Sequence, residues 1–270
     1  MTEKTLNNRK NGMVVLLLLV LVYVASVVLF IFGVSYDILP LTLISCVWFV
    51  FGWIFFLGLK VLKPQEALVL TLFGKYVGTL KNSGFYFVNP FCTAVNPAAG
   101  TKLNQSGDVK VLGAKQPSGG VDVSIDIPTK KISLKIMTLN NNRQKINDCL
   151  GNPVEIGIAV MWRVVDTAKA VFNVDNYKEY LSLQCDSALR NIVRIYPYDI
   201  APNVDTTGDG IADEGSLRGS SEVVAARIKD EIQDKVSEAG IEILEARITY
   251  LAYAPEIAAV MLQRQQASAI

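Results

Sequence analysis

The acidic segment DTTGDGIADE, residues 205–214, holds the clearest arrangement of metal-ligand side chains in the sequence. Asp205, Asp209 and Asp213 recur at the spacing of a calcium-binding loop, in which oxygen ligands must converge on one hard cation. Two positions do not fit that pattern, because the third is a threonine and the twelfth is Ser216 instead of a bidentate glutamate. We therefore expect a solvated loop here, with the three aspartates as the candidate ligands if a cation binds.

The chain contains no histidine. This excludes catalytic dyads and triads built on histidine, metal sites with histidine ligands, and the usual side-chain switch near neutral pH. A membrane-anchored hydrolase with a Ser or Cys nucleophile stays open as an alternative. However, the sequence has no GxSxG or Walker loop and no SxxK in a catalytic context. We therefore predict a protein without enzymatic activity and without a cofactor.

Four cysteines are spaced without a CxxC pair: Cys46, Cys92, Cys149 and Cys185. This usage is typical of reduced, structural thiols in a cytoplasmic protein. Lipidation of Cys92 stays open as an alternative if that residue lies close to a bilayer.

Two segments, 13–34 and 41–59, are almost wholly apolar, and Asp37 between them carries the only charge. At about 1.5 Å per helical residue, each is long enough to cross a hydrocarbon core of roughly 30 Å. Helices of globular proteins normally keep a polar stripe, and these segments have none. We therefore predict a transmembrane helical hairpin over residues 13–62, preceded by a tail over residues 1–12.

The charges that flank the hairpin predict its orientation. Positive side chains precede the first segment and follow the second, whereas residues 35–40 between them carry none; the flanking residues are Lys4, Arg9, Lys10, Lys60 and Lys63. By the positive-inside rule both ends should be cytoplasmic, and the expected location is a bacterial plasma membrane. A re-entrant hairpin and a cleaved signal peptide stay open as alternatives. The spans contain no ionisable residue, so a pore would need many assembled copies.

Beyond residue 62 the composition becomes that of an ordinary folded domain, which we predict over residues 63–254 with an α+β fold. Alternating apolar residues over 153–164 predict a central strand with Trp162 on its buried face. The remaining pattern predicts strands at 67–73 (buried), 77–80, 85–88 and 241–253 (bulged after Ile243). It also predicts helices at 166–172, 176–196, 220–239 (with Ala225 buried) and from Pro255.

Several of these segments resemble one known family when they are taken in order. The segments are KPQEALVLTLFGKYVGTL, SGFYFVNPF, KINDCLGNPVEIGIAVMWRV, SLRGSSEVV and ARITYLAYAPEIAAVMLQRQQASA. From about Val61 to Ile270 the chain is similar to the SPFH or band 7 family of stomatins, prohibitins and flotillins, and most of all to bacterial stomatin-like members with two N-terminal membrane segments.

The resemblance implies a mixed α/β SPFH domain without an active site. It also implies a scaffold that oligomerises into rings or cages, organises membrane microdomains and regulates membrane proteins. The implied partners are copies of the same chain, membrane lipids, and membrane-protein clients such as a membrane-bound AAA protease. Nucleic acid is not an expected partner, because the formal net charge is only +1 and no long basic run occurs.

Two parts of the chain depart from the family pattern. Residues 94–128 form an insertion whose alternating valines and isoleucines predict a β-hairpin, with a disordered segment as the alternative. The family's coiled coil is missing, and residues 255–270 are predicted to be only the start of a C-terminal helix, which we expect to continue in the natural protein. On that helix Ile257, Val260 and Met261 are the candidate oligomer-contact residues.

Overall fold

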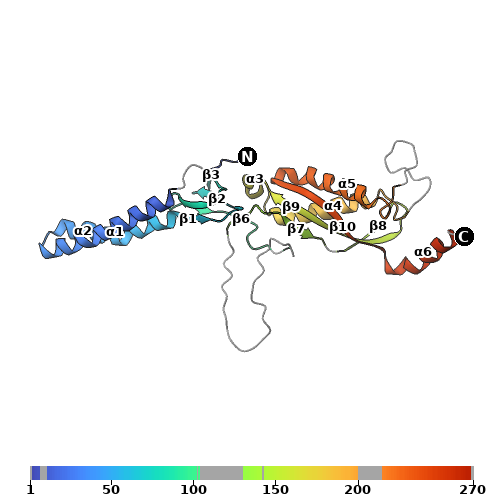
Figure 1. Ribbon diagram of the computed structural model, residues 1–270, viewed down its shortest axis with the longest axis horizontal. Helices are drawn as coiled ribbons and strands as arrows, with labels where there is room; N and C mark the ends of the chain where they lie inside the picture. The colour runs from blue at the N-terminus through green and yellow to red at the C-terminus, as the bar shows by residue number, and fades with distance from the viewer. Residues whose placement is uncertain are drawn as a thin grey trace, which may run out of the picture. The chain divides into compact units, whose positions relative to one another are not determined.

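The computed structural model in Figure 1 describes residues 2–6, 11–101, 103, 130–141, 143–199 and 215–268, with side chains as far as Met261. Contacts divide the chain into two compact units. The first unit comprises Met1–Ala99 and Thr129–Leu134, and the second comprises Gly100–Pro128 and Lys135–Ile270. The fold is α+β, as predicted: two apolar N-terminal helices are followed by β-sheets with packed helices and by a C-terminal helix.

The first unit begins with the predicted helical pair. Helix α1 spans Gly12–Ser35, and α2 spans Leu39–Phe51 and continues as a 3₁₀ helix over Gly52–Gly58. Both helical runs are long and apolar enough to cross a membrane, by length and composition. The second starts two residues earlier than predicted and tightens at Gly52, where a 3₁₀ turn replaces the expected α-helix.

Small side chains let the two apolar helices approach closely. In α1 the buried positions recur every seven residues, at Gly12, Leu19, Ser26 and Gly33; of the two glycines, Gly12 packs against Phe85 and Gly33 against the second helix. A Cβ atom on Gly33 would lie 2.7 Å from Cγ2 of Thr42, so glycine permits this approach. Most of the remaining apolar side chains of the pair are exposed, which suits a hydrocarbon solvent better than water.

Short strands complete the first unit. Strand β1 (Leu59–Leu62) pairs with β4 (Gly84–Phe87), and β2 (Glu66–Leu72) pairs with β3 (Lys75–Leu80), β5 (Thr93–Ala94) and β6 (Ile132–Ser133). The predicted strands at 67–73, 77–80 and 85–88 are therefore confirmed to within two residues. Their buried side chains form one cluster: Leu62, Leu68, Leu70, Leu80, Tyr86 and Cys92.

The N-terminal residues add a further short segment to the β2–β3 sheet, which the sequence did not predict. The amide of Leu6 donates to the carbonyl of Thr79 at 2.9 Å, and the amide of Thr79 donates to the carbonyl of Lys4 at 2.8 Å. Glu3 forms an ion pair with Lys81 at 2.6 Å. We call residues 3–6 the N-terminal clip, because they tie the start of the chain to a strand that follows both apolar helices.

The second unit is built around the predicted central strand. Strand β9 (Pro153–Val164) pairs with β10 (Ile241–Tyr253) on one side and with β7 (Met137–Asn140) and β8 (Gln144–Asn147) on the other. Trp162 is fully buried, and so is the rest of its predicted face: Val154, Ile156, Ile158, Val160 and Val164. The predicted bulge lies between Ile243 and Glu245, and a second register shift follows Ile248.

Three helices of the second unit start and end near the predicted residues. They are α3 (Thr167–Phe172), α4 (Tyr177–Val193) and α5 (Ser221–Val236), and α5 ends in a 3₁₀ turn over Ser237–Ala239. Figure 1 shows α4 and α5 along one face of the sheet. Asp166 caps α3 by accepting a hydrogen bond from the amide of Lys169, and Gly240 adopts the left-handed conformation that ends α5.

Two details of the helices differ from the predictions. The buried stripe of α5 starts at Val224, whereas Ala225 is only partly buried, because the larger side chain faces the sheet. Helix α4 ends at Val193, three residues before the predicted end.

Helix α6 (Pro255–Ser268) begins at the predicted proline. The predicted β-hairpin of the insertion at 94–128 lies, apart from residues 94–101 and 103, outside the described residues.

Candidate functional site

The predicted acidic loop lies outside the described residues, and with it Asp205, Asp209 and Asp213. In the parts of the chain that the structure describes, no group of three or more His, Cys, Asp or Glu side chains is placed to hold a metal ion.

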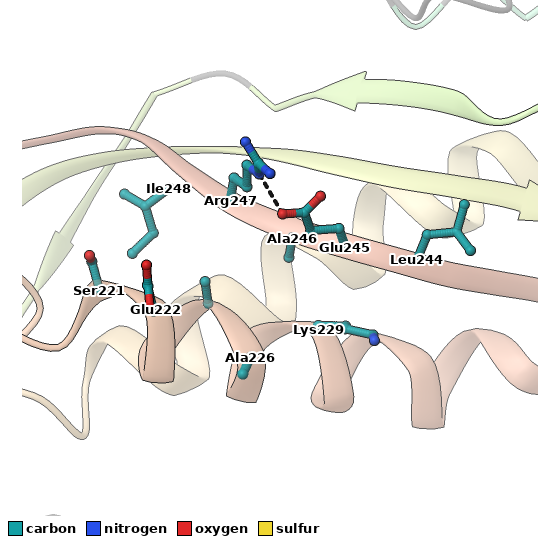
Figure 2. Close-up of a pocket in the computed structure, with 10 residues that line it drawn as sticks. Ser221, Glu222, Ala226, Lys229, Leu244, Glu245, Ala246, Arg247 and Ile248 are labelled. Carbon is teal, nitrogen blue, oxygen red and sulfur yellow. Dashed lines mark hydrogen bonds and ion pairs between the residues drawn. The ribbon is translucent and has the colours of Figure 1, made fainter.

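A groove lies between α5 and β10 of the second unit, as Figure 2 shows. Its volume is about 580 Å³. Helix α5 contributes residues three and four positions apart, which therefore share one face, and β10 contributes the stretch between its two register shifts. The lining residues are Ser221, Glu222, Ala225, Ala226, Lys229, Leu244, Glu245, Ala246, Arg247 and Ile248.

The floor of this groove is lined by small side chains, and its rim carries charged ones. Three alanines leave the space above the floor open, and Leu244 and Ile248 add apolar surface. At the rim Arg247 Nε donates to a carboxylate oxygen of Glu245, and this hydrogen bond raises the pKa of the Arg247 guanidinium. Within the described residues, β10 pairs with β9 on one side and with no strand on the other. The groove thus offers the shape and the free strand edge that suit a segment of polypeptide.

The same groove does not support a hydrolase with a Ser–Lys pair. Ser221 and Lys229 both line it, but they lie about 12 Å apart along the helix axis, and Figure 2 shows the lysine side chain extending away from the serine. Direct proton transfer needs heavy atoms about 3 Å apart. Nothing in the groove therefore places this lysine to activate this serine.

The three thiols outside the apolar helices do not support a cysteine nucleophile either. Cys185 is buried, and that burial raises the pKa of its thiol to about 12, with the nearby Asp186 acting in the same direction. Burial also raises the pKa of the Cys92 and Cys149 thiols. A nucleophilic cysteine needs the opposite shift, because the thiolate is the reactive form.

The candidate oligomer-contact residues lie at the start of α6. The side chain of Val260 is 63% exposed, whereas Ile257 and Met261 are half-buried. Lys145 in β8 donates to Glu256 at 2.6 Å, which lowers the pKa of that carboxyl and ties the first turn of α6 to the sheet. The structure thus leaves at least one apolar side chain of this helix available to another molecule.

Sequence reasoning was wrong about Phe73, which it placed in a buried strand. The side chain is 87% exposed, and the residue lies in the turn between β2 and β3 with a positive φ of 48°. Its ring stacks on that of Phe91, which is 59% exposed, with 6.4 Å between the ring centroids. The following glycine and lysine were the available signals for a turn at this position.

Among known proteins, one family model matches most of the chain. The model of the SPFH domain / Band 7 family matches residues 60–270, which include every strand of both units except the first residue of β1. None of the curated proteins compared with the chain matches it.

Proposed function

Because the chain belongs to the SPFH domain / Band 7 family, we propose that it is a non-enzymatic integral-membrane scaffold whose copies assemble into rings or cages. The family is membrane-associated and scaffold-like, and it is generally non-enzymatic. The observation that carries the proposal is the match over residues 60–270 directly behind two helices that are long and apolar enough to cross a membrane.

The two helices are the proposed membrane anchor. Their exposed apolar side chains would be costly in water and are favourable in lipid. The N-terminal clip supports a hairpin with both ends on one side of the bilayer, because residues 4 and 6 are hydrogen-bonded to Thr79, which lies beyond the second helix. The positive flanks favour the cytoplasmic side of a bacterial plasma membrane for both ends.

The proposed subunit contact is heterologous, as in any ring of identical subunits, so two different surfaces must meet. Helix α6 supplies one surface through Ile257, Val260 and Met261. The α5–β10 groove supplies the other, because its alanine floor lets a helix approach closely and its two larger apolar side chains can receive Val260. Each contact can be weak, since anchoring in one membrane raises the effective concentration of the subunits.

The proposed partners beyond the chain itself are lipids of a membrane patch and membrane-protein clients, among them a membrane-bound AAA protease. A scaffold of this kind would organise membrane microdomains by confining such clients within its ring.

Chemical crosslinking of the full chain in native membranes tests the proposal. We expect a ladder of products well beyond the dimer for the unmodified chain and a strongly reduced ladder for the double variant Val260→Asp and Met261→Asp. Val223→Asp is the matched control, because Val223 is an exposed apolar residue of α5 that does not line the groove. Finding only monomers for the unmodified chain would reject the scaffold.

A further inference from the structure

The turn that joins β2 and β3 places a large aromatic side chain where the backbone favours a small residue. The turn has two residues, Phe73 and Gly74, with φ of 48° and 82°. Two positive φ values in succession define the mirror-image turn that closes tight hairpins, in which the first position favours asparagine, aspartate or glycine. A phenylalanine adopts this conformation at an energetic cost, and its exposed ring recovers little of that cost by burial within the chain.

A second turn brings another exposed ring beside the first. The amide of Cys92 donates to the carbonyl of Asn89 at 2.9 Å, and the amide of Phe91 donates to the side-chain oxygen of Asn89 at 3.0 Å. Strands β2 and β5 pair Thr71 with Thr93, so residues 73 and 91 lie opposite each other just beyond the ladder. The two rings stack with 25° between their planes. We call Phe73 and Phe91 the aromatic pair.

The register of β1 and β4 places this pair near the end of the second apolar helix. Leu59 pairs with Phe87, and the amide of Val88 donates to the carbonyl of Gly58 at 2.9 Å. Gly58 is the last residue of the apolar helical run. Phe91 follows Val88 by three residues, which corresponds to at most about 10 Å of chain. The pair therefore lies close to the level at which the chain would leave the bilayer.

We propose that the aromatic pair is a second membrane contact, which inserts into the headgroup region of the bilayer beside the helical hairpin. This inference rests on the proposed membrane anchor. Phenylalanine side chains of surface-bound segments bury about 5–10 Å into the boundary between headgroups and acyl chains. A bilayer would therefore bury these two rings, which the fold leaves exposed. Lys75, which is exposed next to the turn, is suited to lipid phosphates. The contact would fix the tilt of the first unit on the membrane surface.

Tryptophan fluorescence with brominated lipids tests this contact in the full chain. The chain has only three tryptophans, of which Trp48 and Trp53 lie in the second apolar run and Trp162 is buried in the second unit. The variant Phe73→Trp is made in a background of Trp48→Phe and Trp53→Phe and reconstituted in phosphatidylcholine vesicles. We expect vesicles with brominated acyl chains to reduce its emission relative to vesicles of unmodified lipid. Phe91→Trp is measured in the same way as an independent reporter.

Ser83→Trp in the same background is the matched control. Ser83 is exposed in the turn before β4, at the end of the β1–β4 ladder away from Gly58, so its emission should not respond to bromine. The unsubstituted chain tests whether the apolar helices lie in the bilayer, because brominated lipid should then reduce the emission of Trp48 and Trp53.

The possible results separate the two claims. If the unsubstituted chain is quenched but neither Phe73→Trp nor Phe91→Trp is, the anchor stands and the aromatic pair is not a membrane contact. If the unsubstituted chain is not quenched either, the anchor fails and the inference fails with it. An emission shifted to shorter wavelength without quenching would place the pair against a protein surface and would likewise overturn the proposal.

Discussion

The N-terminal clip leads to a specific prediction for Gly78→Ala. A Cβ atom on Gly78 would lie 2.6 Å from Cγ of Leu6 and 2.9 Å from the carbonyl oxygen of Lys4. Side-chain rotation cannot relieve the second approach, because it involves the backbone. The substitution should therefore displace residues 3–6 from β3. Because Gly78 has a φ of 155°, which alanine rarely adopts, it should also strain β3 at its pair with Leu70.

The magnitude follows from the hydrogen bonds that would be lost. Two backbone hydrogen bonds hold the clip to Thr79, and each contributes about 1 kcal/mol net. The Glu3–Lys81 ion pair adds less, since such pairs near the surface are typically worth under about 1 kcal/mol. A loss of about 2 kcal/mol shifts the opening equilibrium of the clip roughly 30-fold.

Hydrogen exchange measured by mass spectrometry on the full chain in lipid nanodiscs reads this shift directly. Peptides that contain the amides of Leu6 and Thr79 should exchange roughly 30-fold faster in Gly78→Ala than in the parent chain. Gly100→Ala is the matched control, because a Cβ atom there would meet no atom within 4 Å. Equal protection in both variants would refute the clip.

Four further predictions concern single positions. Trp162→Ala should lower the free energy of unfolding by roughly 3–5 kcal/mol in chemical denaturation, because it empties a fully buried site. Calcium should leave the melting temperature unchanged, and a rise that Asp209→Ala abolishes would instead establish a cation site in the acidic loop. Phe73→Asn should raise the free energy of unfolding by about 1 kcal/mol, because asparagine tolerates the positive φ. Hydrogen bonds from Lys235 and Asn191 lower the pKa of Glu231 in the folded protein. The carboxylate therefore stabilises the fold at neutral pH, and this stabilisation is lost as the pH falls through the folded-state pKa. Glu231→Gln should flatten that part of the stability–pH profile.

The local features of the fold could be predicted because they depend on neighbouring residues. The strand over 153–164 has a strict period of two, and every second side chain is buried in the structure. Asp166 and Asn176 precede apolar helical patterns, and both accept hydrogen bonds from the first turns of their helices. Gly240 ends a helical pattern and has the φ of 65° that the chain reversal requires.

The features that the sequence did not predict depend on residues far apart in the chain. The clip pairs residues 3–6 with a strand more than 70 positions away, and four residues are too few to show a periodic pattern. Phe73 continues an apolar run, so only the hairpin geometry reveals that its ring is exposed. The α5–β10 groove likewise has no local signature, because it arises from the packing of a helix on a strand that is distant in sequence at their contacts.

If this chain is a self-assembling membrane scaffold, the mass of the particle that it forms in a membrane will show it. The full chain is extracted with its surrounding lipid into polymer-bounded nanodiscs, without detergent, and weighed by mass photometry. We expect a defined particle whose protein mass is a multiple of 29.6 kDa well above two subunits, and a shift to small particles for the double variant Val260→Asp and Met261→Asp. A particle with a single 29.6 kDa chain for the unmodified protein would contradict it.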